Sequence, residues 1–341
     1  MKKTAIVLLL VIGIPSIASA LTLTESGSSL IYPVAKIWSA NYSRLHPAVV
    51  VTVESTGSGV GISGAVSGHI ALGASDIPLR PEVRVSAGML SIAVAQSAQV
   101  IVYNVPDIGT KHLNLSGDLL AGIYRGEIAY WNDPRIARAN PTLGLPHILI
   151  VPMVRKDASG DTALFTGYLS AQVPLWKNSI GSGLQVTWPK AFASAIGNVG
   201  ILAACAHTQG AIGYLGISYV GAANEASLGY AALLNHDKNY VLPSVKSLAS
   251  AVDGLPKARA SEDASLINRP GSNAYPITNF EYMIVKAKQS SAQSARALRE
   301  FLSYVIDRKG GNDGSVLFNA IFMPLSDSVR SQSQEQISRI Q

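Results

Sequence analysis

Three short turns rich in serine and glycine constrain this chain most, because each lies between an expected strand and an expected helix. The turns are residues 26–29 (SGSS), 55–59 (STGSG) and 159–162 (SGDT). Parallel strands end at one edge of a sheet, and a helix beginning there presents unpaired N–H groups and the positive end of its dipole. Three such helix starts that converge predict a site for an oxyanion. Plain helix caps and turns, with no ligand, are the alternative interpretation.

The rest of the chain alternates between apolar strands and helical patterns. Strands are expected at residues 21–24, 49–53, 69–73, 99–103, 148–154, 211–219 and 281–286, with helices between them. This alternation predicts an α/β fold with mostly parallel sheets. We expect the chain to leave the first domain near 99–103 and to return near 273–280. The polar end, 326–341, is expected to form a peripheral helix.

Length and composition agree with two globular domains. The chain has 341 residues, of which 48% are hydrophobic and 14% charged, and a single core rarely grows beyond about 250–300 residues. The formal net charge of +6 falls to +4 if the lysines at positions 2 and 3 are removed with the N-terminal segment. The remaining positive charge is spread along the chain, so we expect no nucleic-acid partner.

The N-terminus has the pattern of a cleavable signal peptide. Lys2 and Lys3 precede a short apolar run, and Ala18-Ser-Ala20 fits the small-residue cleavage rule. We therefore expect residues 1–20 to be a signal peptide, with an uncleaved anchor as the alternative. No Cys follows the expected cleavage site, so lipid attachment there is not expected.

The sequence carries no motif of a familiar enzyme class. It has no Walker A sequence, no His-Glu-x-x-His, no Gly-x-Ser-x-Gly, and its six His have no ligand spacing. The single Cys205 lies in an apolar segment and is expected to be a buried structural residue. A dinucleotide fingerprint occurs at residues 59–64 (GVGISG), but Glu82, at the required distance, lies in a Pro/Arg-rich loop. We expect no catalytic residue, no metal and no cofactor.

Seven longer motifs make the sequence specific. In chain order they are Gly27-Ser-Ser-Leu-Ile-Tyr-Pro33, Gly57-Ser-Gly-Val-Gly61, Gly73-Ala-Ser-Asp-Ile-Pro78, Ile123-Tyr-Arg-Gly126, Val154-Arg-Lys-Asp-Ala-Ser-Gly160, Gly210-Ala-Ile-Gly-Tyr214 and Tyr275-Pro-Ile277. In this order they resemble the phosphate-binding proteins that serve phosphate-specific ABC transporters. The resemblance implies a two-lobed periplasmic binding protein of type II-like fold. Each lobe would hold a mostly parallel sheet flanked by helices, with a hinge of crossover strands. With the domain changes expected near 99–103 and 273–280, lobe I comprises 21–100 plus 273–341 and lobe II comprises 101–272.

The resemblance also implies a set of phosphate-binding residues. They are Ser29, Leu30, Ser58, Asp76, Arg155, Ser159, Gly160 and Asp161. Ser29 and Leu30 stand where the family often has Thr and Phe, so Leu30 keeps its backbone N–H and loses an aromatic wall. Asp161 stands where many members have Thr. It is either a first-turn acid outside the site or a second acceptor beside Asp76.

The carboxylate of Asp76 explains how such a site could choose its anion. A carboxylate only accepts hydrogen bonds, and phosphate near neutral pH carries a proton to donate, whereas sulfate does not. A buried acceptor left unpaired disfavours the wrong ligand by factors of about 10⁴–10⁵. A salt bridge or helix cap without a ligand is the alternative role for Asp76.

These inferences favour a non-enzymatic carrier that closes two lobes around inorganic phosphate and delivers it to the permease of an ABC importer. Binding of another oxyanion, sulfate or molybdate, is the alternative within the same class. An exported phosphatase and a secreted or adhesion protein with the same fold are alternatives from other classes. We expect a monomer in the periplasm, or a secreted protein.

Overall fold

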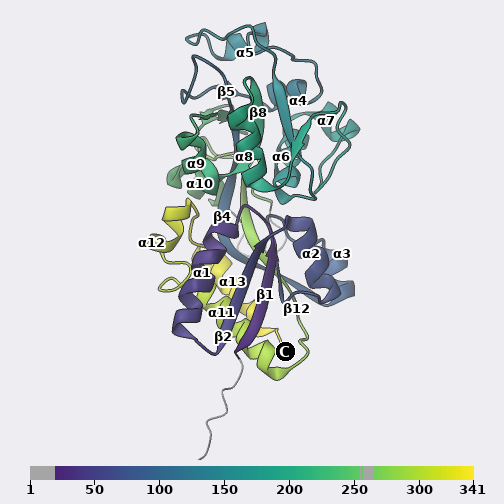
Figure 1. Cartoon of the computed structure of the whole chain (residues 1–341), viewed down its shortest axis with the longest axis vertical. Coiled ribbons are helices and arrows are strands. Elements are labelled where there is room, and N and C mark those ends of the chain that lie inside the picture. Colours follow the sequence, from purple (N-terminus) through teal and green to yellow (C-terminus); the bar gives the residue numbers. More distant parts are fainter. Residues whose placement is uncertain (1–19, 254, 256–264) are drawn as a thin grey trace, which may run out of the picture.

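The computed structural model describes residues 20–253, 255 and 265–341. The expected signal peptide lies outside the described residues except for Ala20. Figure 1 shows two lobes along the long axis of the molecule, joined by the long strands β4 and β12. Within the described residues, no helix combines the length and the apolar character that crossing a membrane requires.

A nine-stranded sheet runs through both lobes in the order β2-β1-β3-β12-β4-β8-β6-β7, with β9 beside β4. A small sheet of order β11-β10-β5 lies in lobe II. The strands are β1 Leu21–Gly27, β2 Val49–Ser55, β3 Leu72–Ser75, β4 Met89–Tyr103, β5 Asn114–Leu115, β6 Val151–Arg155, β7 Ala193–Ala195, β8 Ala211–Gly216, β9 Gly229–Tyr230, β10 Ala232–Leu234, β11 Tyr240–Val241 and β12 Thr278–Lys286.

Each lobe has a parallel set of three strands, as the α/β pattern predicts. β1 pairs in parallel with β2 and β3 in lobe I, and β6 pairs in parallel with β7 and β8 in lobe II. Between these sets, β12 and β4 run antiparallel to their neighbours. β4 pairs with β12 as far as Ala98 and with β8 from Gln99 onward, so one strand belongs to both halves of the sheet. The two-lobed α/β fold with crossover strands is confirmed.

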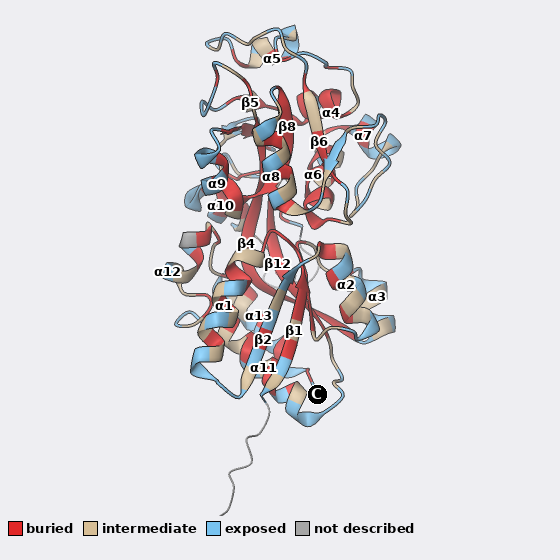
Figure 2. Ribbon diagram, in the orientation of Figure 1, coloured by how far each residue is buried: buried red, intermediate tan, exposed pale blue. Residues whose placement is uncertain are grey.

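Helices cover the faces of this sheet. They are α1 Tyr32–Leu45, α2 Ser58–Ser67, α3 Pro81–Ala87, α4 Gly117–Tyr124, α5 Pro134–Ala139, α6 Gly160–Gln172, α7 Pro174–Ser179, α8 Gly197–His207, α9 Val220–Glu225, α10 Val245–Val252, α11 Ala292–Ile306, α12 Gly314–Leu317 and α13 Asp327–Ser338. Short 3₁₀ turns follow at η1 Ile217–Tyr219 and η3 Phe318–Ala320. Figure 2 shows the buried strands of the sheet between half-exposed helices, which is the layering expected for a parallel sheet.

Several elements differ from the sequence expectation. Glu82, which the sequence places in a loop, lies in helix α3. β4 begins at Met89 rather than at 99, and all 15 of its residues are buried, so it lacks the alternation that marks a half-exposed strand. The strand expected at 211–219 ends at Gly216 and continues as η1. The C-terminal helix is not peripheral, because Val329 and Ile337 of α13 are buried and Ser333 Oγ donates to Ala93 O of β4 at 2.7 Å.

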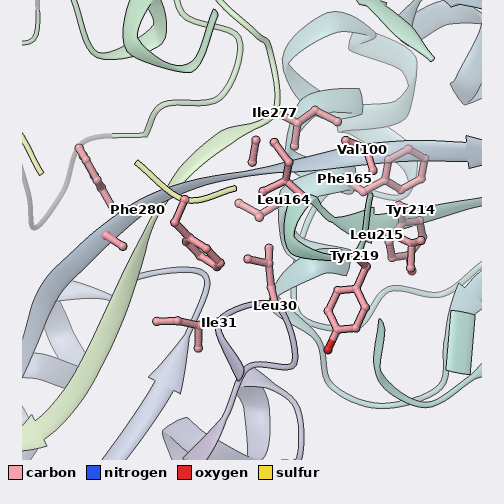
Figure 3. Packing of buried hydrophobic residues seen from close by; sticks show 14 of the residues in the cluster. Leu30, Ile31, Val100, Leu164, Phe165, Tyr214, Leu215, Tyr219, Ile277 and Phe280 are labelled. Carbon is pink, nitrogen blue, oxygen red and sulfur yellow. The ribbon is translucent and has the colours of Figure 1, made fainter. Parts of the chain in front are cut away.

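Large side chains fill the core on both sides of β4. In lobe I, Tyr42 of α1 packs edge-on against Phe301 of α11, with ring centroids 5.1 Å apart. In lobe II, Phe165 stacks on Tyr214 at 4.8 Å. Figure 3 shows residues of both lobes, among them Leu30 and Tyr219, gathered around β4. Cys205 is buried in α8, as expected.

Candidate functional site

The three Ser/Gly turns do connect strands to helices, at β1–α1, β2–α2 and β6–α6. The starts of α2 and α6 meet across the two lobes, where Gly59 N donates to Ala158 O at 2.9 Å. Gly160 lies so close to Ser58 that a Cβ on Gly160 would be 2.6 Å from Ser58 Oγ. Only glycine at position 160 allows this approach, so the starts of α2 and α6 converge as the sequence predicts.

Asp76 follows β3 and is buried between these helix starts. Ser28 Oγ donates to Asp76 Oδ1, and Ser58 Oγ donates to Asp76 Oδ2 at 3.3 Å. Burial, and then the charge of Asp161, raise the pKa of Asp76 to about 7, while the Ser28 hydrogen bond acts in the opposite direction. The Asp76 carboxyl group is therefore an acceptor whose proton occupancy changes near neutral pH.

Arg155, at the end of β6, is held between two carboxylates. Its Nε donates to Asp157 Oδ1 at 2.8 Å, its Nη2 pairs with Asp157 Oδ2, and its Nη1 donates to Asp161 Oδ2 at 2.5 Å. Burial alone would lower the pKa of Arg155, but its hydrogen bond to Asp157 and the charge of Asp161 raise the pKa above the ordinary value. A guanidinium has five N–H donors, so Arg155 keeps donors for an anion.

Asp161 lies inside the cluster and not on the outer surface of α6. Its side chain is 1% exposed, and besides Arg155 it accepts from Asn198 Nδ2 at 2.8 Å and from Gln99 Nε2 at 3.2 Å. Burial raises the pKa of Asp161, and the charge of Arg155 opposes that shift. Three donors, one each from β6, α8 and β4, thus hold this carboxylate beside the helix starts.

Ser29 and Leu30 join lobe I to lobe II. Ser29 Oγ accepts from Asn198 Nδ2 at 2.9 Å, and Tyr219 Oη donates to Ser29 O at 2.9 Å. The Leu30 side chain packs on Gly216 of β8, where a Cβ would lie 3.0 Å from Leu30 Cβ. The Leu30 N–H donates to Ser28 Oγ at 3.0 Å. Both residues therefore contribute to contacts between the lobes.

The structure brings all of the predicted residues into one buried cluster. They are Ser29, Leu30, Ser58, Asp76, Arg155, Ser159, Gly160 and Asp161. Ser159 caps α6, where its hydroxyl accepts from Thr162 N. Within the described part of the chain, no three His, Cys, Asp or Glu side chains are grouped to hold a metal ion.

Sequence reasoning missed several residues of the cluster, above all Asn198. Asn198 is the second residue of α8, after Gly197, which has a φ of +67°. The Oδ1 of Asn198 accepts from Gly216 N at 2.7 Å. A glycine followed by a polar residue at a helix start is the same local signal as in the three turns. Gln99, a polar residue within an apolar strand, was the second available signal.

A prediction about lobe closure follows from the contact between Gly59 and Ala158. Gly59→Ala places a methyl group against the Ala158 side chain of the other lobe, so it is expected to hinder closure and weaken anion binding. Overpacking of about 1–3 kcal/mol corresponds to a loss of about 5-fold to 150-fold in affinity. Titration calorimetry checks this, with Gly167→Ala in α6 as the control, because nothing lies within 4 Å of a Cβ there. Recovery in the double variant Gly59→Ala/Ala158→Gly is expected, and its absence would show that the contact does not limit closure.

A second prediction concerns the stability of the ligand-free protein. The pKa of Asp76 is raised to about 7 by burial, against about 3.9 in an unfolded chain. The folded state therefore binds more protons, so this contribution to stability is fully present below about pH 4 and is lost as the pH rises through about 7. Denaturant titrations measure the free energy of unfolding of the native protein and of Asp76→Asn. The advantage of the native protein over the variant should decrease as the pH rises over this range. A difference in unfolding free energy that does not change with pH would contradict the raised pKa of Asp76.

Comparisons with known proteins agree with this architecture. The model of the PBP superfamily domain matches residues 15–309. Phosphate-binding protein PstS of Methanocaldococcus jannaschii is 35% identical over 81% of this chain and 75% of that protein. PstS of Haemophilus influenzae is 30% identical over 99% of both chains.

Two solved structures share the fold. A high-affinity periplasmic phosphate-binding protein, PfluDING, has a TM-score of 0.72 at 17% identity and covers 92% of this chain and 93% of its own. A phosphate-binding protein from Stenotrophomonas maltophilia has a TM-score of 0.70 at 19% identity and covers 93% of this chain and 94% of its own. The match of the family model and the identity to full-length relatives lead to one conclusion: the chain belongs to the PBP superfamily and, within it, to the PstS family of phosphate-binding proteins.

Proposed function

We propose that this protein binds one inorganic phosphate ion between its lobes and delivers it to the membrane permease of an ABC importer. The observation that carries the proposal is a buried carboxyl acceptor, Asp76, placed among the starts of α2 and α6 and near Arg155. Helix N-termini and a guanidinium supply donors for a buried anion. The names of the relatives, phosphate-binding protein PstS, support the same ligand.

In this proposal each predicted residue has a role toward the ion. Ser58 and Ser159 donate hydroxyls, Arg155 donates N–H groups, and the backbone N–H groups of Leu30 and Gly160 line the site. Ser29 and Asp161 complete the ring of polar groups. The lobes that carry them are 21–100 plus 273–341 and 101–272, and the change of partner of β4 at Gln99 supports that division.

Phosphate is favoured over sulfate or molybdate because of Asp76. An anion without a proton would place an oxygen against a carboxylate with no hydrogen between them. The proposed role is that of a carrier and not an enzyme, because the relatives are named phosphate-binding proteins. The signal-peptide pattern and the family support a location in the periplasm, and a monomer with a permease as its partner is part of the proposal.

A crystal structure with phosphate tests this proposal. We expect a single ion in contact with Ser58 and Asp76 of lobe I and with Arg155 and Ser159 of lobe II. An ion that touches one lobe only would contradict the proposal.

The pH dependence of binding tests the role of Asp161. Its Oδ2 is occupied by Arg155 and Asn198, whereas its Oδ1 accepts only from Gln99 in the described structure, so Oδ1 keeps a lone pair for a second ligand proton. Affinity for total phosphate should then fall as the pH rises through the second ionisation of the ion. Asp161→Thr is expected to flatten this fall. Parallel curves for the two proteins, measured by calorimetry, would mean that Asp161 does not detect that proton.

A further inference from the structure

Glu281 lies directly behind Asp76, on the hinge strand β12. Its side chain is fully buried, and the register between β12 and β4 shifts at the bulge between Glu281 and Tyr282. Bulges of this kind re-aim side chains near functional sites. Asn279, two residues earlier on β12, donates from Nδ2 to Glu281 Oε1 at 2.8 Å and to Asp76 O at 3.2 Å. One amide therefore links Glu281 to the segment that carries Asp76.

The carboxyl groups of Glu281 and Asp76 are hydrogen-bonded to each other. An ionised carboxylate has no hydrogen to donate, so one of the two groups must carry a proton. No donor among the described residues reaches Glu281 Oε2, which leaves that oxygen free to carry it. The charge of Arg155 favours the ionised form of Asp76 and lowers its pKa, whereas the hydrogen bond to Asp76 raises the pKa of Glu281. The proton therefore belongs on Glu281 and the negative charge on Asp76.

The charges around Glu281 support this assignment. Burial, the charge of Asp76 and the charge of Asp161 on α6 all raise the pKa of Glu281 well above its ordinary value, and the Asn279 hydrogen bond opposes them only in part. The hydrogen bond from Glu281 acts in the other direction on Asp76 and lowers its pKa, as does the one from Ser28. A donor hydrogen bond favours the charged form of the group that accepts it.

We propose that Glu281 is a positioning residue that determines anion specificity: it keeps its proton and donates it to Asp76, which holds Asp76 as an ionised acceptor facing the ligand. This inference rests on the proposed phosphate-binding function. Without the donor, Asp76 would take up a proton at a higher pH, because it is buried beside Asp161. A protonated Asp76 has an O–H that can donate to an unprotonated oxygen, so it would no longer reject sulfate.

Two variants separate the effect of the hydrogen-bond donor at position 281 from the effect of side-chain volume. Glu281→Gln keeps the contacts, because the amide oxygen can accept from Asn279 while the NH₂ group donates to Asp76. Glu281→Leu introduces an apolar side chain of similar size and removes the donor. Affinities for phosphate and sulfate are measured by calorimetry on ligand-stripped protein between about pH 5.5 and 8.5, a range that includes the pKa of Asp76.

The expected signature is a shift along the pH axis. In every protein the phosphate-to-sulfate affinity ratio should fall as the pH is lowered. In Glu281→Leu the midpoint of this fall should lie about one pH unit or more above the midpoint for the native protein. Glu281→Gln should stay within about threefold of the native ratio at about pH 7, because its amide still donates. The proposal would be overturned if the ratio in Glu281→Leu followed the native ratio at every pH, or if it were lower by the same factor at every pH.

An infrared measurement on the ligand-free protein gives an independent test. A protonated carboxyl band should be present near neutral pH and should lose intensity in Glu281→Gln. Glu25→Gln serves as the control, because Glu25 is a second buried acid whose pKa is raised by burial and by the charge of Glu54. This variant should remove a different component of the protonated carboxyl band. An unchanged spectrum in Glu281→Gln would overturn the assignment of the proton. If the native protein failed to bind phosphate, the proposed function would fall while this spectral result stood.

Discussion

Arg155→Met is expected to lower the free energy of unfolding of the ligand-free protein by about 3–5 kcal/mol, the cost of leaving buried charge without its partner. Arg155 is paired with both Asp157 and Asp161, and its side chain is 1% exposed. Loss of the guanidinium leaves the carboxylates of Asp157 and Asp161 without the partner that they share. The same variant should bind phosphate far more weakly, because these acids then repel the ion. Urea titration measures the first effect and calorimetry the second.

Arg135→Met is the matched control for stability. Arg135 also pairs with an aspartate, Asp133, at 2.8 Å, but its side chain is 49% exposed. Exposed ion pairs contribute about 0–1 kcal/mol, so this variant should change stability little. If both variants lost the same free energy of unfolding, burial would not explain the contribution of Arg155 to stability.

Arg155→Lys separates charge from geometry. An ammonium keeps the positive charge and cannot reproduce the planar fork that bonds two oxygens at fixed positions. Phosphate affinity should therefore fall even though the net charge is unchanged. Undiminished affinity would show that Arg155 acts only as a distant charge.

Asp76→Asn is expected to lower the phosphate-to-sulfate affinity ratio by about 10²–10³, a large part of the discrimination that a buried unpaired acceptor provides. The amide of Asn can donate to an unprotonated oxygen, so sulfate gains a partner that the carboxylate denies it. Phosphate affinity should fall by a smaller factor, because phosphate can still pair with the amide. Calorimetric titration of both anions gives the ratio directly.

Asp133→Asn is the control for this substitution, because Asp133 is the N-cap of α5, which lies at the end of lobe II away from the cluster. It should leave the ratio unchanged. A ratio in Asp76→Asn equal to that of the native protein would refute the idea that Asp76 detects the proton of the ligand.

Local sequence signals predicted the helix starts well. The turn that ends in Ser58 and the cap at Ser159 are encoded by a few adjacent residues, because the hydrogen bonds of a helix start lie within one turn of it. β4 was predicted only from Gln99 onward, because a strand buried on both faces has no periodicity to mark its beginning. The role of α13 was misjudged because its polar composition hides a narrow buried stripe that includes Val329.

The electrostatic arrangement of the site could not be predicted from the sequence. Asp161 had two interpretations, and its burial with Arg155 and Asn198 depends on how β6, α6 and α8 meet in three dimensions. Glu281 lies about 200 residues from Asp76 in the sequence, and only the pairing of β12 with β3 and β4 brings the two together. Contacts of this kind leave no local pattern.

Calorimetric titration of ligand-stripped protein with phosphate, arsenate and sulfate tests the central claim most directly. Stripping the protein first is essential, because a protein that purifies with its ligand bound would give no heat. The account predicts one phosphate per chain, competition by arsenate, which has the same charge and shape, and binding of sulfate weaker by several orders of magnitude. No binding of phosphate by the stripped protein, or equal affinity for phosphate and sulfate, would contradict it.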